Sequence, residues 1–388
     1  MSIIILADDF PPELGGIQTY ACELSRALAE LGEEVAVVAS QQEGAEEVDA
    51  QLPFPVLRVS TGGGYPVAAM NLSIGARQMA AQARTPVRCM VATKWAPEGP
   101  AAILAFSALR CPMLLIGHGG EFSHTGGSVV KWLVQRVVLR RMSRFLANSH
   151  YTAELFAKAR VPRDRIGIIY GGVRLEAFDV TQQRAREVRD EMQLGDRPLL
   201  LSASRLVTRK GHDTVLRALP AVLERFPDAL YLVAGTGPLE DVLRALVDEI
   251  GVGESVRFCG RVADEQLPAL YAAADIFVMP SRPVRGELAE GLGLAYLEAA
   301  AAGTPSIGTN FGGIPDAIAD GETGLLVEPD DHEALGQAIV GLLEDDARRE
   351  EMGQAARQRV REQYTWQRVA ERFLEELATL ENAGAGAR

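Results

Sequence analysis

Short runs of uniformly apolar residues alternate with helix-length amphipathic segments along almost the whole chain. A strand that is apolar at every position is buried on both faces, so this alternation predicts parallel sheets covered by helices on each side. Since 388 residues are too many for one small core, the sequence predicts two doubly wound α/β domains. The expected strands are Ile3–Leu6, Val35–Ala39, Val56–Val59, Cys89–Ala92, Met113–Gly117, Phe145–Asn148 and Ile166–Tyr170, followed by Leu199–Ala203, Tyr231–Ala234, Val256–Cys259, Ile276–Met279, Ser306–Gly308 and Leu325–Val327.

The interval between the two series of strands, residues 173–197, is charged, poor in strand patterns and ends in LGDRP. We interpret it as the connection between the two domains and place the boundary between residues 177 and 178. Helical patterns cover Thr19–Leu31, Val129–Met142 and Trp366–Leu380, and the final ENAGAGAR is expected to fray.

The composition, with 47% apolar and 23% charged residues, is that of an ordinary globular protein. The four cysteines, Cys22, Cys89, Cys111 and Cys259, are scattered without metal-ligand spacing, which favours a reduced, cytoplasmic environment. The early run IIILA has no basic region before it, so it is expected to be a buried strand and not a signal peptide. No apolar run is long enough to span a membrane. A net charge of −13 argues against nonspecific binding of nucleic acid.

The segment GELAEGLGLAYLEAAAAG, residues 286–303, joins a glycine-rich turn to a helix. The N-terminus of a helix offers unpaired N–H groups and a positive dipole end, which together suit a phosphate. Glu290 and Glu298 flank this position, and two hydroxyl-binding carboxylates beside a diphosphate would suit a nucleotide sugar. The alternative is a surface helix with ordinary glutamates beside a glycine-rich loop.

Further candidate residues follow other predicted strands, and ligands of open parallel sheets bind at the carboxyl ends of strands. Gly15 and Gly16 precede a helix and could seat an anion, or they could form a simple turn. Arg205 and Lys210 follow a strand, and a guanidinium with an ammonium five residues later suits a diphosphate, the alternative being a solvated basic loop. His118 lies at a strand end in GHGGEFSHTGG, with a structural role as the alternative and Glu121 and His124 as reserves.

The turn LVAGTGPLEDVL repeats the strand–glycine–helix pattern at Gly235 and Gly237. It lacks the full dinucleotide fingerprint and its acidic ribose partner, which argues against a nicotinamide cofactor.

Taken together, these segments resemble the retaining family 4 (group 1) glycosyltransferases of the GT-B architecture, whose two domains are both Rossmann-like. The likeness runs from residue 8 to about residue 329, and its wording is most similar to bacterial GDP-mannose-dependent mannosyltransferases, including those that act on phosphatidylinositol. It implies an N-terminal acceptor-binding domain over residues 1–177, joined by the C-terminal helix 366–388, and a nucleotide-sugar-binding domain over residues 178–365. The matching segments are PPELGGIQTY, GHGGEF, ANSHYTAELF, IYGGV, SASRLVTRKGH, LVAGTGP, VRFCGRVADEQL, MPS, EGLGLAYLEAAAAGTPSIGTNFGGIPDAI and GETGLLVEP.

The resemblance implies roles for the loop that carries the two glutamates. Glu290 would bind hydroxyl groups of the donor sugar. Backbone N–H groups of Gly291, Leu292 and Gly293 would contact the sugar and the phosphate. Glu298 would hold the ribose hydroxyls.

The resemblance also assigns the diphosphate and the reacting centre. Arg205 and Lys210 would clamp the diphosphate and stabilise the charge of the leaving group. Gly15 and Gly16 would offer the first domain's anion seat, with Gly16 approaching the same diphosphate. His118 would lie near the reacting sugar and the acceptor.

The nucleotide base is assigned to the loop at Arg261, Val262 and Asp264, with Asp264 accepting from a base edge and Gly235 contributing to the donor site. The stretch SRPVRGELA, residues 281–289, departs from the family wording beside the expected sugar pocket. The donor sugar is the assignment that this departure affects.

The family reaction moves a sugar from a nucleotide diphosphate to a hydroxyl with retention of configuration. Glu290 could serve as the nucleophile of a two-step route, but we favour departure and attack on one face, with the leaving diphosphate accepting the acceptor's proton. No DxD triplet is present, since Asp8-Asp9 and Asp330-Asp331 are not one. We therefore expect neither a metal nor a cofactor, and the nucleotide sugar is a co-substrate.

Other functions remain open from the sequence. The donor could be UDP-glucose or UDP-N-acetylglucosamine, with a soluble small-molecule acceptor. A sugar-nucleotide epimerase or an inactive nucleotide-binding scaffold would share the architecture. The scaffold is disfavoured because Arg205, Lys210 and Glu290 are all present.

Charge is distributed unevenly along the chain. Residues 51–150 contain 11 Lys and Arg against 2 Asp and Glu, which leaves 39 − 11 = 28 against 52 − 2 = 50 in the rest. Within this basic region, residues 128–145 form a helical pattern with a cationic stripe beside an apolar face. The stripe comprises Lys131, Arg136, Arg140 and Arg144. The pattern predicts either a helix packed on the core with a solvated basic edge or docking on an anionic membrane at the inner face of the cell.

Overall fold

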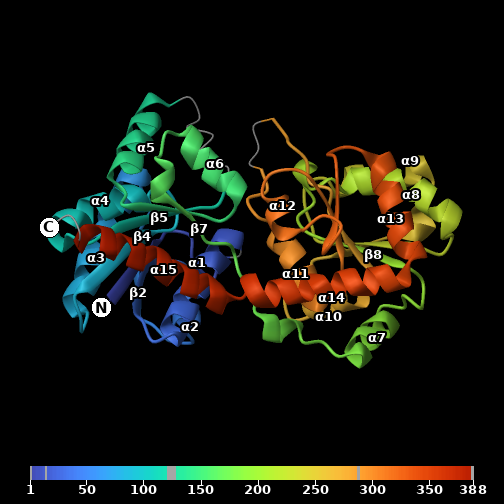
Figure 1. Cartoon of the computed structure of the whole chain (residues 1–388), viewed down its shortest axis with the longest axis horizontal. Helices are drawn as coiled ribbons and strands as arrows, with labels where there is room; N and C mark the ends of the chain where they lie inside the picture. Colours follow the sequence, from blue (N-terminus) through green and yellow to red (C-terminus); the bar gives the residue numbers. More distant parts are fainter. Residues whose placement is uncertain (1, 14, 120–127, 286–288, 386–388) are drawn as a thin grey trace. The chain divides into compact units, whose positions relative to one another are not determined.

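The computed structural model describes residues 2–13, 15–119, 128–285 and 289–385. The chain divides into two compact units, one formed by Met1–Gly172 with Trp366–Arg388 and the other by Val173–Thr365 (Figure 1). The sequence-based boundary between residues 177 and 178 lies close to the point, between Gly172 and Val173, where the chain first passes from one unit to the other. At that crossing the Val173 N–H donates to the Tyr364 carbonyl at 2.7 Å, so the chain enters and leaves the second unit at one place.

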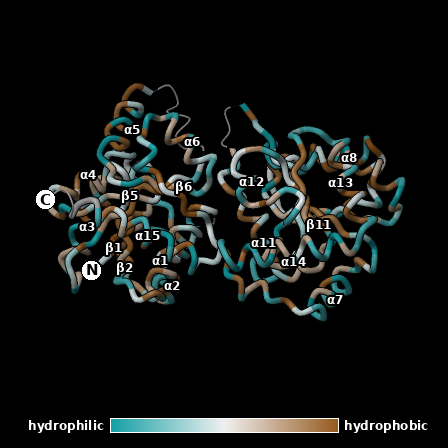
Figure 2. The backbone as a smooth tube through the Cα atoms, viewed as in Figure 1, coloured by the Kyte–Doolittle hydropathy of each residue, from teal (hydrophilic) through white to brown (hydrophobic). Residues whose placement is uncertain are grey.

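The first unit is built on one parallel sheet with the strand order β3-β2-β1-β4-β5-β6-β7. Alternate residues of β1 face opposite ways, so Ile3 and Ile5 pack against α1 and α15, whereas Ile4 and Leu6 pack against α3, α4 and α5. The strands therefore form the apolar interior of this unit (Figure 2). The strands are β1 (Ser2–Ala7), β2 (Glu34–Ser40), β3 (Val56–Val59), β4 (Val87–Ala92), β5 (Met113–Gly117), β6 (Arg144–Ala147) and β7 (Ile166–Ile168), and the helices are α1 (Gly16–Glu30), α2 (Ala45–Asp49), α3 (Tyr65–Gln82), α4 (Glu98–Leu109), α5 (Val129–Arg141), α6 (His150–Lys158) and α15 (Trp366–Ala385).

The second unit has a parallel sheet with the order β10-β9-β8-β11-β12-β13. One face of this sheet packs against α8, α9 and α13 around Leu200, Val233 and Ile276. The strands are β8 (Leu199–Ala203), β9 (Leu230–Ala234), β10 (Val256–Gly260), β11 (Ile276–Val278), β12 (Ser306–Thr309) and β13 (Gly324–Val327). The helices are α7 (Gln182–Glu191), α8 (His212–Arg225), α9 (Glu240–Ile250), α10 (Leu267–Ala273), α11 (Leu294–Ala302), α12 (Ile314–Ala317), α13 (His332–Glu344) and α14 (Asp346–Gln363).

The two parallel-sheet α/β units confirm the predicted fold class, and every predicted strand is present with its ends shifted by two residues at most. Two local predictions are wrong. The interval 173–197 is not a bare connection, because it contains α7, whose Arg189 donates to the Ala273 carbonyl at 2.8 Å and so binds the segment to the second unit. The tail does not fray from residue 381, since α15 continues to Ala385.

The predicted basic stripe is corrected at one position. Arg144 lies on β6 and not on α5, and its Nε donates to Glu376 of α15 at 2.6 Å. The prediction that α5 packs on the core with a solvated basic edge is also only partly right. Val138 and Leu139 are buried, but most of the helix's other apolar side chains are exposed. Among the described residues, no helix has the length and apolarity that a membrane crossing requires.

Candidate functional site

In the second unit, the strand order reverses between the adjacent strands β8 and β11. Ligands of open parallel sheets bind where the order reverses, beyond the carboxyl ends of the strands. The loop after β8 carries Arg205 and Lys210, and the loop after β11 carries Glu290. The fold therefore brings together residues that lie about 80 positions apart in the sequence.

Glu290 is the centre of this site. One carboxylate oxygen, Oε2, lies 2.6 Å from Lys210 Nζ and 3.0 Å from Arg209 Nη1. Burial alone would raise the pKa of Glu290, but the charges of Lys210 and Arg209 outweigh it and hold the pKa below its ordinary value. The carboxyl group is therefore ionised at neutral pH. Arg209 was not predicted, although its place beside Lys210 in RLVTRKG was visible in the sequence.

The loop after β8 is held by close backbone contacts. Gly211 has φ +73°, and a Cβ there would lie 2.0 Å from the Pro280 carbonyl oxygen. Gly235, at the end of β9, has φ +140°, and a Cβ there would lie 1.9 Å from the Ser204 carbonyl oxygen. Glycine is needed at both positions so that the loops after neighbouring strands can touch. Gly235, which was predicted to contribute to the donor site, therefore allows the close packing of the loop that carries Arg205.

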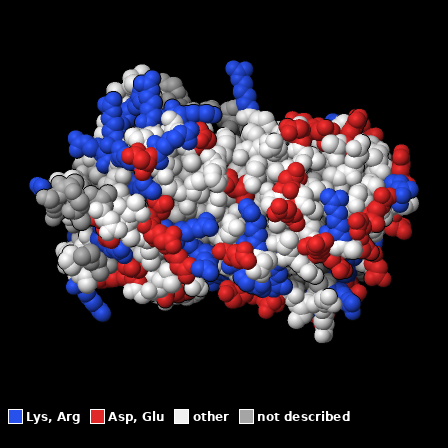
Figure 3. Space-filling view, in the orientation of Figure 1, with Lys and Arg blue, Asp and Glu red and all other residues white. Residues whose placement is uncertain are grey.

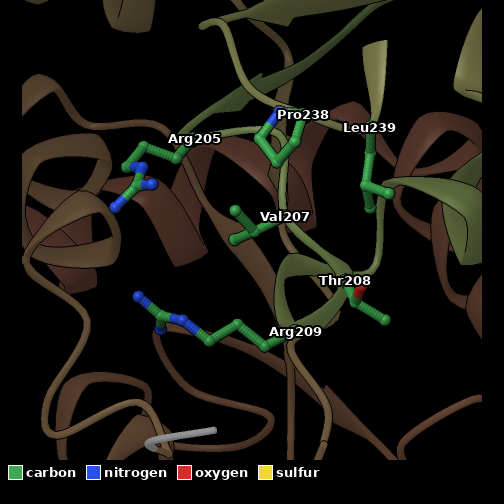
Figure 4. Close-up of a pocket in the computed structure, with 6 residues that line it drawn as sticks. All are labelled: Arg205, Val207, Thr208, Arg209, Pro238 and Leu239. Atoms are coloured by element: carbon green, nitrogen blue, oxygen red, sulfur yellow. The ribbon is translucent and has the colours of Figure 1, made fainter. Parts of the chain in front are cut away.

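Beside this loop is a cavity of about 270 Å³. The side chains of Arg205 and Arg209 extend to the same side of the loop, so two guanidinium groups border one space (Figure 4). Such an arrangement suits an anion, because the guanidinium of Arg205 can donate two parallel hydrogen bonds to it, while Arg209 is already paired with Glu290. The cavity is lined by Arg205, Val207, Thr208, Arg209, Pro238 and Leu239.

A buried network of polar side chains anchors the loop after β8. His212 lies 3.0 Å from the Tyr231 hydroxyl through Nδ1 and 3.0 Å from the Ser204 hydroxyl through Nε2, and Ser202 lies 2.8 Å from the same tyrosine. Burial, with a smaller effect of the Lys210 charge, lowers the pKa of His212 to about 4. The neutral ring therefore anchors Ser204, the residue directly before Arg205.

The glycine turn Gly291–Gly293 is buried and leads directly into α11. Gly293 precedes this helix with φ +85°, and the first turn has no side-chain cap, although the Tyr296 N–H donates to the Gly293 carbonyl at 3.0 Å. On α11, Glu298 accepts a hydrogen bond of 2.8 Å from the Tyr271 hydroxyl. Burial raises the pKa of Glu298, and the charge of Asp264 raises it further, so the predicted ribose and base residues do lie near each other.

A second glycine pair, which sequence reasoning did not single out, holds Glu290. The Gly313 N–H donates to the Glu290 carbonyl at 2.9 Å. Gly312 has φ +62°, and a Cβ there would lie 2.5 Å from the same oxygen. The sequence feature that could have indicated this glycine pair is the segment NFGGIPDAI, which resembles the family's sequence pattern.

The remaining predicted base contacts, Arg261 and Val262, lie in the loop after β10, where Arg261 is exposed and Val262 is half-buried. Within the described ranges, no group of three or more His, Cys, Asp or Glu side chains is arranged to hold a metal ion. In this unit Lys210 contacts Glu290, and the charges of Lys210 and Asp264 both act on Glu298.

In the first unit, Gly15 and Gly16 stand at the start of α1. Both residues are exposed, and the helix has no side-chain cap. A Cβ at Gly16 would meet no atom within 4 Å, and one at Gly15 would meet only the flexible side chain of Gln18. The internal packing of this unit therefore does not demand glycine at residue 16, and the helix N-terminus is open to a ligand.

His118 lies at the end of β5, half-buried against Tyr20, with the ring centroids 4.9 Å apart. Its Nε2 lies 3.0 Å from the Thr93 carbonyl, which can only accept, so this nitrogen carries the proton. Burial lowers the pKa of His118 to about 4, and the charge of Lys94 lowers it too. The reserves Glu121 and His124 lie outside the described residues.

Two charged residues near His118 were not predicted. Lys94 pairs with Asp9 at 2.6 Å and lies 3.7 Å from Glu98, which is fully buried. Glu98 accepts from the Asp8 N–H at 3.0 Å, and burial raises its pKa to about 7. These side chains join the ends of β1 and β4, where the strand order of the first sheet reverses.

Known proteins are similar to this chain over nearly its whole length. Residues 184–359 match the family model described as glycosyl transferases group 1, and residues 14–177 match the model described as glycosyltransferase family 4. The chain is 34% identical over 383 residues, 95% of its length and 96% of the relative, to the GDP-mannose-dependent alpha-(1-6)-phosphatidylinositol monomannoside mannosyltransferase of Mycobacterium tuberculosis. It is 32% identical, over 95% of its length and 96% of the relative, to the GDP-mannose-dependent monoacylated alpha-(1-6)-phosphatidylinositol monomannoside mannosyltransferase of Corynebacterium glutamicum. Among solved structures, HepE of Anabaena in complex with UDP superposes with a TM-score of 0.81 at 20% identity, covering 98% of this chain and 100% of the other.

Proposed function

This chain belongs to the group 1, family 4 glycosyltransferases, and we propose that it transfers mannose from GDP-mannose, with retention of configuration, to a hydroxyl of a lipid-linked or glycan acceptor. The observation that carries the proposal is the Lys210–Glu290–Arg209 cluster at the strand-order reversal of the second unit. The choice of mannose and GDP rests on the activities of relatives that are similar over nearly the full length.

The chemistry asked of this site is electrostatic. As the bond between the sugar and the diphosphate breaks, negative charge grows on the leaving oxygen, and cations that are already in place stabilise that charge. Arg205 and Lys210 serve this role. Backbone N–H groups at the N-terminus of α11, which has no side-chain cap, donate to phosphate oxygens. The leaving oxygen then takes the proton of the attacking hydroxyl on the same face of the sugar, so that the new bond has the configuration of the old one.

The neutral state of His118 fits a place beside the reacting sugar. An imidazole with a pKa of about 4 adds no positive charge next to a developing oxocarbenium ion at neutral pH. Its ring can still contact sugar hydroxyls through polar atoms and the ring edge.

The function is tested by incubating the purified protein with GDP-mannose, UDP-glucose and UDP-N-acetylglucosamine, each with a phosphatidylinositol mannoside or a soluble sugar. We expect GDP release that depends on the lipid acceptor, an α-linked product by NMR, and full activity in excess EDTA because side chains supply the cations. Release of UDP with a soluble acceptor would support the alternative hexosyltransferase. Release without any acceptor product would point to an epimerase or hydrolase, and a loss in EDTA that magnesium restores would overturn the metal-free mechanism.

Substitutions of the two glutamates should have different effects on GDP binding and on turnover. Glu298→Gln is expected to weaken GDP itself, because the carboxylate is assigned to ribose. Glu290→Gln should leave GDP affinity within about threefold while lowering turnover about tenfold or more, the size expected for loss of a charge-assisted hydrogen bond. Titration calorimetry with GDP and steady-state kinetics with GDP-mannose measure the two effects, and the opposite pattern would exchange the assignments.

We also propose that the first unit meets an anionic membrane through α5 and α3. On α5, Val130 is 70% exposed and Leu133 is 51% exposed, and on α3 Met70 and Ile74 are exposed. Lys131 Nζ lies 5.2 Å from the centre of the Tyr65 ring, which joins the two helices into one surface. Exposed apolar side chains bordered by cations suit the boundary between headgroups and acyl chains. Lys and Arg gather over α5 in the view of Figure 3.

Membrane binding is expected to need both charge and anionic lipid. Each cation near the surface contributes about 1 kcal/mol, so changing Lys131, Arg136 and Arg140 together to Glu should weaken binding about a hundredfold or more. Sedimentation with phosphatidylglycerol-containing and pure phosphatidylcholine vesicles measures this, with Arg217, Arg225 and Arg244→Glu on the second unit as the charge-matched control. Equal binding of the α5 variant and the control would contradict the proposed surface.

A further inference from the structure

The single positive charge of Lys210 is needed by two partners, Glu290 and the donor diphosphate. In the structure its ammonium group lies 2.6 Å from Glu290, yet the proposed reaction needs that same group at the donor diphosphate. The side chain of Glu290 is only 14% exposed. A carboxylate so enclosed is strongly destabilised if it loses its cation without a replacement. Moving Lys210 toward phosphate therefore requires a second partner for Glu290.

Arg209 is placed to be that partner, since its Nη1 contacts the same oxygen of Glu290 at 3.0 Å. Its backbone is held by Arg282, whose N–H donates to the Arg209 carbonyl at 2.9 Å and whose Nε donates to the Thr208 carbonyl at 3.1 Å. The Arg282 guanidinium is in turn fixed by Asp213 at 2.6 Å and Asp330 at 2.7 Å. Arg282 belongs to the stretch 281–289, the segment that departs from the family wording.

We propose that Arg209 is a positioning residue of this enzyme, which keeps Glu290 fixed and ionised when Lys210 turns to the donor diphosphate. The inference rests on the proposed function for the identity of the donor. The planar, rigid guanidinium suits the lasting contact, and the compact ammonium on its flexible stem suits the exchange. No bond is made or broken in this step, and only the partner of Lys210 changes.

The charged and titratable groups around Glu290 come from two elements. Arg209 and Lys210 face it from the loop after β8, and the Tyr296 hydroxyl, buried on α11, feels its charge. From the loop after β12, the backbone of Gly312 and Gly313 approaches the Glu290 carbonyl. Removing Arg209 therefore leaves Lys210 as the one cation that the described residues place on this carboxylate, and the pKa of Glu290 should rise.

The test compares Arg209→Gln, Arg209→Lys and the wild type, with Arg225→Gln as the matched control. Arg225 is likewise paired with a carboxylate, Glu344, but on the exposed surface of α8. In Arg209→Gln we expect kcat to fall about tenfold or more, as for a lost charge-assisted hydrogen bond, while GDP affinity changes less than about threefold. The acid limb of the kcat profile should move to higher pH, and Arg209→Lys should restore both properties in part.

A readout that does not need turnover separates this inference from the proposed function. The ¹³C signal of the Glu290 carboxyl group, assigned through Glu290→Gln, should titrate at higher pH in Arg209→Gln than in the wild type. If the wild type fails to use GDP-mannose, the proposed function is wrong, but this titration still tests the pair. An unshifted titration would overturn the inference, and so would lost GDP affinity at unchanged kcat, which would place Arg209 on the diphosphate itself.

Discussion

Alanine at Arg205 or at Lys210 is expected to lower the turnover of GDP-mannose about a hundredfold or more, the cost of removing one preorganised charge partner of a transition state. Arg205 borders the cavity beside the loop after β8, and Lys210 is held in the site by Glu290. Because the diphosphate gains charge as it leaves, both cations contribute more to the transition state than to the bound donor. The loss should therefore appear mainly in kcat.

Conservative variants sharpen this experiment. Arg205→Lys keeps the charge but not the planar pair of donors, so it should recover only part of the activity. The exposed Arg225, in the same unit but outside the site, provides the control as Arg225→Ala. Near-normal kcat in both alanine variants would contradict the assignment of the diphosphate to the loop after β8.

Acidification is expected to destabilise the second unit through His212. Burial lowers the pKa of this side chain from 6.5 to about 4, so the folded state binds fewer protons than the unfolded state between these values. The stability that His212 provides is complete above pH 6.5 and is lost as the pH falls toward 4. A shift of this size corresponds to about 3 kcal/mol.

The measurement compares the thermal unfolding of the wild type and His212→Gln at pH values from 4 to 7. The difference between them isolates His212 from His118, whose pKa is also lowered to about 4 and which is unchanged in both proteins. The variant should be less stable at pH 7 and should show a flatter dependence on pH. Parallel curves would mean that the pKa of His212 is the same in the folded and the unfolded protein.

The sequence by itself determined the strands and the class of fold. A strand such as Met113–Gly117 is apolar at every position, and both burial and strand geometry follow from that local pattern. The sequence also placed Arg205 and Lys210 after a strand, where ligands of parallel sheets bind, and Glu290 beside a glycine-rich turn that leads into a helix. Local composition could not tell a connection from a helix, which is why α7 within residues 173–197 was missed.

Only the tertiary structure decided which of these loops meet. The strand order places β8 beside β11, and this neighbourhood brings Lys210 and Glu290 to 2.6 Å. The same applies to Arg209, whose role depends on a carboxylate 81 residues away. It also applies to Arg144, which lies on β6, pairs with Glu376 of α15 and so is not part of the α5 stripe. The physical reason is that pKa values and ion pairs depend on distances across the sheet, and periodicity along the chain carries no information about those distances.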